Sequence, residues 1–258
     1  MTRPTESNGS WSGRRSPEPA ACRSLYRPAA LAAIGLVALT ILHSAVFFVV
    51  GLPATVHDWF DLYARNPVGG LLAFELLMVL YVVVSVPVVL ALGATLARGA
   101  PALAAVYVGL AFVGIVAFIS ARPAFEMLTL ANGYAAATTE VGRAAFIAGG
   151  EMAVAVFHGT AFWTSYLLGS GGGVVLGVAI LRTGVFSRKT AALRLASSVF
   201  DLGLFIPGIG LGIALLSILC LLGFNLLVAR QLWALGREDA RIGVGLAPTS
   251  AIGTGAAR

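Results

Sequence analysis

The sequence predicts an all-α protein, a polytopic bundle of transmembrane helices, and three observations support this fold class. Of the 258 residues, 59% are hydrophobic and only 11% are charged, whereas a soluble domain carries about 25% charged residues. Long apolar runs alternate with short loops in which the basic residues gather. At about 1.5 Å per residue, these runs are long enough to cross a hydrocarbon core of about 30 Å.

The expected spans end at prolines or at basic turns. Pro53 ends the first, Arg122-Pro123 stops the third and Pro207 ends the fifth, because proline lacks the N–H that continues a helix. Pro87 lies inside the second span and predicts a kink there. A six-helix transmembrane domain is expected over 28–235, between disordered tails at 1–27 and 236–258, with spans at about 29–52, 68–97, 102–120, 156–181, 190–206 and 208–232.

Residues 123–156, between spans three and four, are moderately apolar but carry several charges. This pattern predicts one or two amphipathic helices at the outer interface, and Thr138 or Thr139 is a suitable N-cap for the second. A deep span that starts at Ala144 is the alternative.

The fourth span is rich in glycine, with Gly169, Gly173 and Gly177 four residues apart. A loop facing lipid would leave its backbone polar groups without partners. The spacing therefore favours a helix with a small-residue face for close packing, either within the bundle or in a helix-mediated oligomer. A local break that lines a cavity is the alternative.

The basic residues predict the orientation. With six spans and both termini in the cytoplasm, 14 of the 17 Lys and Arg residues are cytoplasmic, and only Arg65, Arg122 and Arg143 are outside. This asymmetry is typical of the positive-inside rule, so the net charge of +6 indicates membrane orientation and no nucleic-acid partner. Arg122 and Arg143 are expected to anchor the outer interface. The excess of Arg over Lys, with abundant Ala and Gly, is typical of a GC-rich bacterial genome, and hence of the bacterial cytoplasmic membrane.

Five ionisable side chains fall in the outer half of this topology, namely His43, Glu75, Glu151, His158 and Asp201. A charged residue in a span costs roughly 2.5–3.5 kcal/mol and usually faces the bundle interior or water. We therefore predict that they gather in an outward-facing polar cavity. The alternatives differ by residue. His43 could bond a neighbouring helix, and Glu75 could be protonated or paired with Arg122, Arg143 or a histidine. Glu151 and His158, seven apart, could form a metal or acid–base pair or the wet face of an interfacial helix.

The fifth span carries a polar seam along one helical face, formed by Thr190, Arg194, Ser197, Ser198 and Asp201. This spacing is compatible with a cavity wall or an ion path. It is equally compatible with hydrogen bonds between helices, with the Arg194 side chain extended to the cytoplasmic interface.

Metal and cofactor chemistry has little support. His and acidic residues can bind zinc or iron, but no local ligand spacing, nucleophile elbow, P-loop or Rossmann fingerprint occurs. We expect no metal, no cofactor and no catalytic residue.

Two stretches resemble a bacterial family of multi-pass membrane proteins that is classed only as a domain of unknown function. They are Ala64-Arg65-Asn66-Pro67 and the segment 177–188, in which Leu181-Arg182-Thr183-Gly184 forms the family's turn and Ser187 replaces its usual proline. The resemblance implies a six-span bundle in the cytoplasmic membrane and assigns no functional residue.

Three functions follow as expectations. The first is binding or transport of a small molecule, lipid or ion in the polar cavity. The second is an integral membrane enzyme that uses the same side chains, and the third is an accessory protein whose polar residues serve helix packing. Binding or transport is preferred, with the lipid bilayer as the constant partner.

Overall fold

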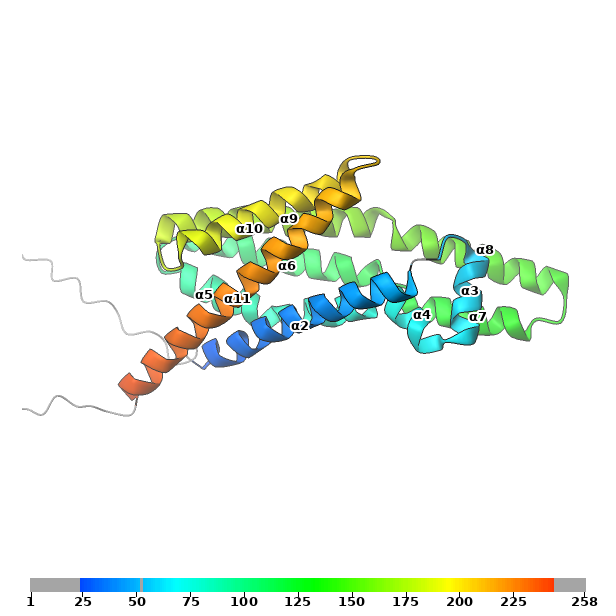
Figure 1. Ribbon diagram of the computed structural model, residues 1–258, viewed down its shortest axis with the longest axis horizontal. Helices are drawn as coiled ribbons and strands as arrows, with labels where there is room; N and C mark the ends of the chain where they lie inside the picture. Colours follow the sequence, from blue (N-terminus) through cyan, green and yellow to red (C-terminus); the bar gives the residue numbers. More distant parts are fainter. Residues whose placement is uncertain (1–23, 52, 244–258) are drawn as a thin grey trace, which may run out of the picture.

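The computed structural model describes residues 24–51 and 53–243, and this part of the chain is helical throughout, joined by turns (Figure 1). The expected tails lie mostly outside the described residues, although α11 continues to Gly243. The elements in order are α2 (Tyr26–Val50), α3 (Val56–Arg65), α4 (Pro67–Ala73), α5 (Leu76–Leu96), α6 (Pro101–Ser120), α7 (Ala124–Ala136), α8 (Glu140–Phe157), α9 (Thr160–Thr183), α10 (Arg188–Asp201), the 3₁₀ helix η1 (Leu202–Phe205) and α11 (Gly210–Gly243).

Six helices run lengthwise through the molecule, α2, α5, α6, α9, α10 and α11 (Figure 1). Both described chain ends lie at one end of this bundle, whereas α3, α4, α7 and α8 gather at the other. Five stretches are long and apolar enough to cross a membrane, and they lie within 26–50, 76–96, 101–136, 140–183 and 212–237. The chain is therefore a multi-pass helical membrane protein. At 14 residues, α10 is not among these five.

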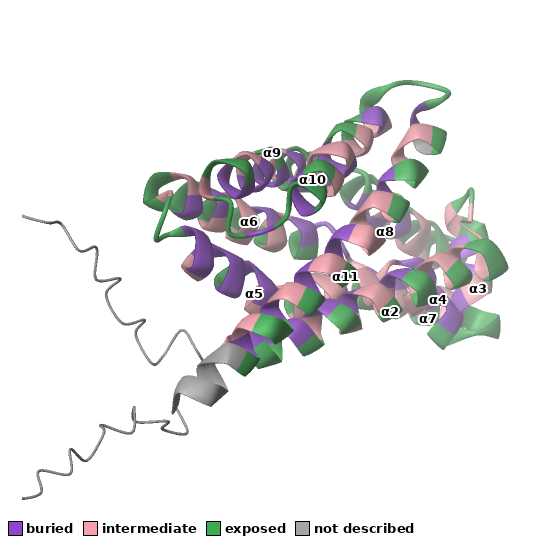
Figure 2. Cartoon of the chain, turned by 60° about the vertical axis from the view of Figure 1, so that its left-hand side comes forward, coloured by how far each residue is buried: buried purple, intermediate pink, exposed green. Residues whose placement is uncertain are grey.

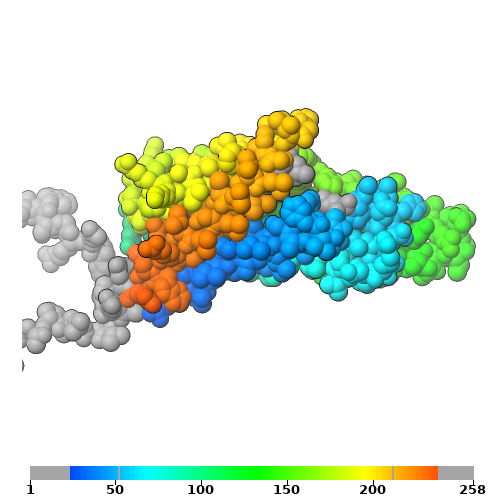
Figure 3. All heavy atoms as spheres, viewed as in Figure 1, coloured from blue at the N-terminus to red at the C-terminus, as the bar shows by residue number. Residues whose placement is uncertain are grey.

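The outer surface of the bundle suits a lipid environment. Large apolar side chains point outward, and Phe48, Val116 and Leu219 are 75%, 63% and 67% exposed. Figure 2 shows such exposed residues on the outward faces of helices whose inward faces are buried. In Figure 3, α2 and α11 lie side by side along one face, as their close contacts require. A bilayer would solvate this apolar surface.

The buried residues form two separate hydrophobic cores. The first joins the lengthwise helices near the end that holds the termini, where Leu92, Ile180 and Leu232 are almost completely buried. The second joins α3, α4, α7 and α8 around aromatic rings. Its centre is Phe74, whose ring lies 4.4 Å from that of Trp59 and 4.7 Å from that of Phe157.

Hydrogen bonds at the start of α3 and between α3 and α7 position the helices of the second core. Thr55 accepts a hydrogen bond from the Asp58 backbone N–H, and Asp58 Oδ2 accepts one from the Thr55 N–H, so a capping box starts α3. The Thr55 hydroxyl also donates to Asp58 Oδ2 at 2.7 Å. This hydrogen bond, followed by the one from the Thr55 backbone N–H, lowers the pKa of Asp58. The Tyr63 hydroxyl donates to the Ala124 carbonyl at 2.9 Å, which ties α3 to α7.

The expected second span is divided into two helices. The chain breaks between α4 and α5 at Glu75, whose φ of 60° makes it the only non-glycine with positive φ among the described residues. A left-handed conformation is costly for a residue with a Cβ and persists only where the surroundings hold it. Pro87 lies inside α5, twelve residues beyond Glu75.

Residues 123–156 form the helices α7 and α8, and Thr139 is the N-cap of α8 because its hydroxyl accepts from the Gly142 N–H at 3.1 Å. This N-cap prediction is confirmed. The two helices extend past the ends of α5 and α10 along the long axis of the molecule (Figure 1). Their packing against α3 and α4 builds the second core.

The glycine-rich segment is an unbroken part of α9, as predicted, and Gly184 in the left-handed region ends it. Two of the three glycines meet α10. A Cβ at Gly173 would lie 2.5 Å from Arg194 Nη2, and one at Gly177 would lie 2.6 Å from Leu195 Cγ. The missing side chains therefore allow α9 and α10 to pack closely.

Candidate functional site

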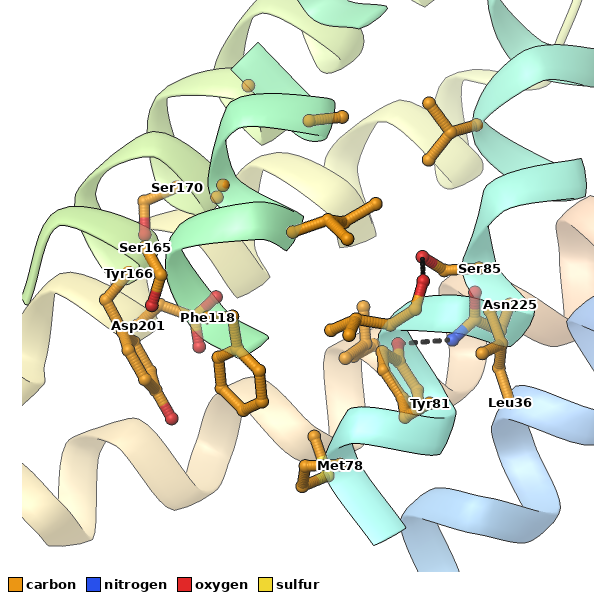
Figure 4. Close-up of a pocket in the computed structure, with 18 of the residues that line it drawn as sticks. Leu36, Met78, Tyr81, Ser85, Phe118, Ser165, Tyr166, Ser170, Asp201 and Asn225 are labelled. Carbon is orange, nitrogen blue, oxygen red and sulfur yellow. Dashed lines mark hydrogen bonds between the residues drawn. The ribbon is translucent and has the colours of Figure 1, made fainter. Parts of the chain in front are cut away.

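A cavity of about 350 Å³ lies in the bundle, and residues of the first core such as Leu92 and Leu176 form part of its wall. All six lengthwise helices contribute to its wall, which is mostly apolar, with side chains such as Leu36, Met78 and Phe118. Figure 4 shows the space between α9 and α10 on one side and α5 and α11 on the other, with polar groups on both walls. A pocket of this size and composition is typical of small-molecule sites.

Three of the five predicted cavity residues line this one cavity. They are His43 from α2, Glu75 from the break before α5, and Asp201 from the end of α10. Glu151 and His158 do not line it, because α8 extends beyond the bundle and leaves both residues exposed. The prediction that all five share a cavity was wrong for this pair. The His158 ring instead packs edge-on against Phe157, at 4.7 Å between centroids.

Glu75 pairs with Arg122, one of the alternatives that the sequence left open. Arg122 Nε donates to Glu75 Oε2 at 2.8 Å, and Arg122 Nη2 lies 2.5 Å from the same oxygen. The guanidinium also lies over three aromatic rings, at 4.0 Å from the Phe118 centroid, 4.7 Å from Phe157 and 5.1 Å from Phe162. This ion pair holds the Glu75 carboxylate at the cavity end that adjoins the second core.

Arg122 was expected to anchor the outer interface, but its side chain is 0% exposed and is enclosed by Glu75 and the rings of Phe118, Phe157 and Phe162. Arg143 differs, with a side chain that is 46% exposed and a nitrogen 3.6 Å from Glu140.

The polar seam of α10 serves both roles that the sequence allowed: some of its residues are buried between helices and others line the cavity. Thr190, Ser197 and Ser198 are completely buried against neighbouring helices, and the Thr190 hydroxyl donates to Gln231 of α11 at 3.3 Å. Arg194 and Asp201 line the cavity. Arg194 does not extend to the end of the bundle that holds the termini, since its Nη2 donates to the Gly169 carbonyl of α9 at 3.1 Å.

Several cavity groups were missed by the sequence reasoning. Asn225 of α11 donates from Nδ2 to the Tyr81 hydroxyl of α5, at the long distance of 3.5 Å, on the wall opposite Asp201 (Figure 4). Tyr107 and Tyr166 also line the cavity. Asn225 was detectable in principle, because it is a buried amide in an apolar span. The two tyrosines could not be assigned to a cavity from the sequence, because tyrosine is also common where helices meet the lipid headgroups.

Three cavity-lining polar atoms are buried without a hydrogen-bond partner in the described part of the chain, namely His43 Nδ1, Ser170 Oγ and Arg194 Nε. Buried polar atoms are rarely left unsatisfied. Within residues 24–51 and 53–243, no three His, Cys, Asp or Glu side chains lie close enough together to hold a metal ion. The arrangement suits a guest that offers hydrogen-bonding groups.

Fold and site together define a class, the multi-pass helical membrane proteins with a central cavity between their helices. No family model matches the chain, and neither curated proteins nor solved structures show a significant match. The resemblance to a bacterial membrane family therefore stays a prediction.

Proposed function

We propose that this protein binds a small amphipathic molecule in the central cavity of its bundle. The convergence of ionisable and hydroxyl groups from different helices on one mainly apolar cavity carries the proposal. Polar residues are costly inside a membrane domain unless they have partners. Thr190 bonds to Gln231 of the neighbouring helix and Ser198 to the Arg194 carbonyl of its own helix, so both are satisfied without a ligand. Arg194 Nε and Ser170 Oγ are not satisfied in this way.

The size of the cavity limits the guest. An apolar cavity of about 150 Å³ is known to bind benzene, and the volume here is about 350 Å³. A chain of about eight carbons with one polar end fits this space. The apolar walls would solvate the chain and the polar groups would bind its head.

Binding of radiolabelled 1-octanol and octanoate to the protein in lipid nanodiscs tests this function. We expect saturable binding of one molecule per chain with at least one of the two probes, above the partitioning into empty nanodiscs. Ala111→Phe places a ring in the cavity wall and should weaken binding about tenfold or more. Ala105→Phe makes the same change on the exposed face of the same helix and should not.

Binding that rises linearly with both probes, as in empty nanodiscs, contradicts the proposed function. Equal binding by both variants and the wild type places the probes outside the cavity and contradicts it as well.

Six membrane crossings form part of the proposal. The α10 helix covers about 21 Å, and the four residues of η1 add about 8 Å at the 3₁₀ rise. Their combined length of about 29 Å approaches the hydrocarbon thickness of about 30 Å. The arginine asymmetry supports cytoplasmic termini in a bacterial cytoplasmic membrane. In this topology Glu75, just before α5, and Asp201, at the end of α10, are both expected in the outer half of the membrane.

Single cysteines in a cysteine-free background test this topology with a membrane-impermeant maleimide. We expect Thr138→Cys, in the exposed α7–α8 turn, to react in intact cells. Val185→Cys, in the exposed turn between α9 and α10, should react only after lysis. Reaction of both cysteines in intact cells would contradict six crossings with this orientation.

A further inference from the structure

We propose that the molecule bound in this cavity is a monocarboxylate, whose anionic head is held by Arg194 and Ser170. This inference rests on the proposed function and adds the chemical class of the ligand. It identifies one end of the cavity as a carboxylate site and the apolar wall as the site for the rest of the molecule.

Two arginines inside the bundle, Arg122 and Arg194, differ in their acidic neighbours. Arg122 is neutralised by Glu75 in direct contact. In the part of the chain that the structure describes, Arg194 has no carboxylate within 4.0 Å, and its contacts are the Gly169 carbonyl and the Phe224 ring at 5.7 Å. Asp201 lies two helical turns further along α10, where it accepts a hydrogen bond from Ser217. Asp201 acts on Arg194 electrostatically from that distance, but no carboxylate of the described residues contacts the Arg194 guanidinium directly.

Unsatisfied donors lie together at Arg194 and Ser170. Arg194 Nε is buried without a partner, and so is Ser170 Oγ, whose residue is only 3% exposed. Both residues line the cavity. Because Arg194 Nη2 already reaches the carbonyl of Gly169, the neighbour of Ser170, the two donors belong to one locus. An arginine fork together with a hydroxyl matches the oxygens of a carboxylate.

The surrounding wall carries both hydroxyl groups and apolar side chains. Tyr81 and Tyr107 line the same cavity and carry hydroxyl groups. Much of the remaining wall is apolar, with side chains such as Met78, Ile115 and Phe118, although Glu75 and Asp201 also belong to it. A carboxylate at Arg194 would therefore leave its hydrocarbon part among apolar side chains. A cationic head group at Arg194 would instead place positive charge beside a guanidinium, which is unfavourable.

The test compares three probes that differ only in the head group, octanoate, 1-octanol and octylammonium, in equilibrium binding to the nanodisc-embedded protein. Hydrogen bonds to a charged acceptor are stronger than those to a neutral one, so octanoate should bind at least about tenfold more tightly than 1-octanol. Octylammonium should bind more weakly than both. This ranking in the wild-type protein needs no variant and stands even if a substitution impairs folding.

Two variants on α10 localise the effect. Arg194→Gln should weaken octanoate binding at least about tenfold while leaving 1-octanol within about twofold. Arg188→Gln makes the same change at an exposed position of the same helix and should alter neither. Ser170→Ala should weaken octanoate binding alone.

Equal binding of octanoate and 1-octanol, both blocked by Ala111→Phe, would overturn the carboxylate site and leave the proposed function intact. Tighter binding of octylammonium than of 1-octanol would overturn it too. The absence of saturable binding by all three probes would remove the proposed function together with this inference.

Discussion

Arg122→Met is expected to lower the free energy of unfolding by about 3–5 kcal/mol, because removal of one partner leaves the other charge of a buried pair uncompensated. The arginine side chain is 0% exposed and the Glu75 side chain 21% exposed. Glu75 also sits in a left-handed conformation that this contact helps to hold. Reversible unfolding of the detergent-purified protein in SDS, monitored by circular dichroism, would measure the loss.

The double variant Glu75→Gln/Arg122→Met separates the lost charge balance from lost packing. It removes both charges, and it should recover most of the stability that Arg122→Met loses. Arg143→Met is the matched control, since its pair with Glu140 is exposed and should contribute less than about 1 kcal/mol. A single variant as stable as the Arg143→Met control would contradict the structural role of the pair.

Phe74→Ala is expected to destabilise the protein by about 3–5 kcal/mol, as truncation of a buried aromatic ring leaves a cavity. The Phe74 residue is 0% exposed and its ring contacts those of Trp59 and Phe157 at the centre of the second core. The same unfolding experiment measures the change. Phe125→Ala, on α7 at a residue 59% exposed, is the control and should cost far less. Similar losses for both variants would contradict a distinct packed core at this end.

Phe74→Ala should also increase local motion near the substituted residue. Because Phe74 immediately precedes Glu75, loss of the ring should also loosen the break between α4 and α5. Hydrogen exchange over 67–79 should therefore increase in Phe74→Ala, while α9 stays protected.

Apolar runs and prolines predicted most of the helices, because a span in lipid must satisfy its backbone internally and its length follows from the bilayer. The break at Glu75 was not predictable from hydropathy, since residues 68–97 are apolar on both sides of it. It depends on a partner 47 residues away, Arg122. Long-range pairing of this kind leaves no local periodicity in the sequence.

Some of the cavity residues were predictable from their positions along the expected spans. Depth along a span can be counted in residues, which identified His43, Glu75 and Asp201. The same count failed for Glu151 and His158, because it placed them at the outer end of the fourth span, whereas both are exposed and lie outside the cavity. Arg194 was found as part of a periodic seam, but the carbonyl that it contacts belongs to another helix and carries no sequence signal.

An anomalous-scattering crystal structure with 8-bromooctanoate tests the central claim, that the bundle binds an amphipathic molecule between its helices. We expect one bromine peak inside the cavity, next to side chains such as Met78 and Phe118, with the carboxylate at Arg194. Bromine peaks confined to the outer, lipid-facing surface, with the cavity free of the probe at saturating concentration, would contradict it.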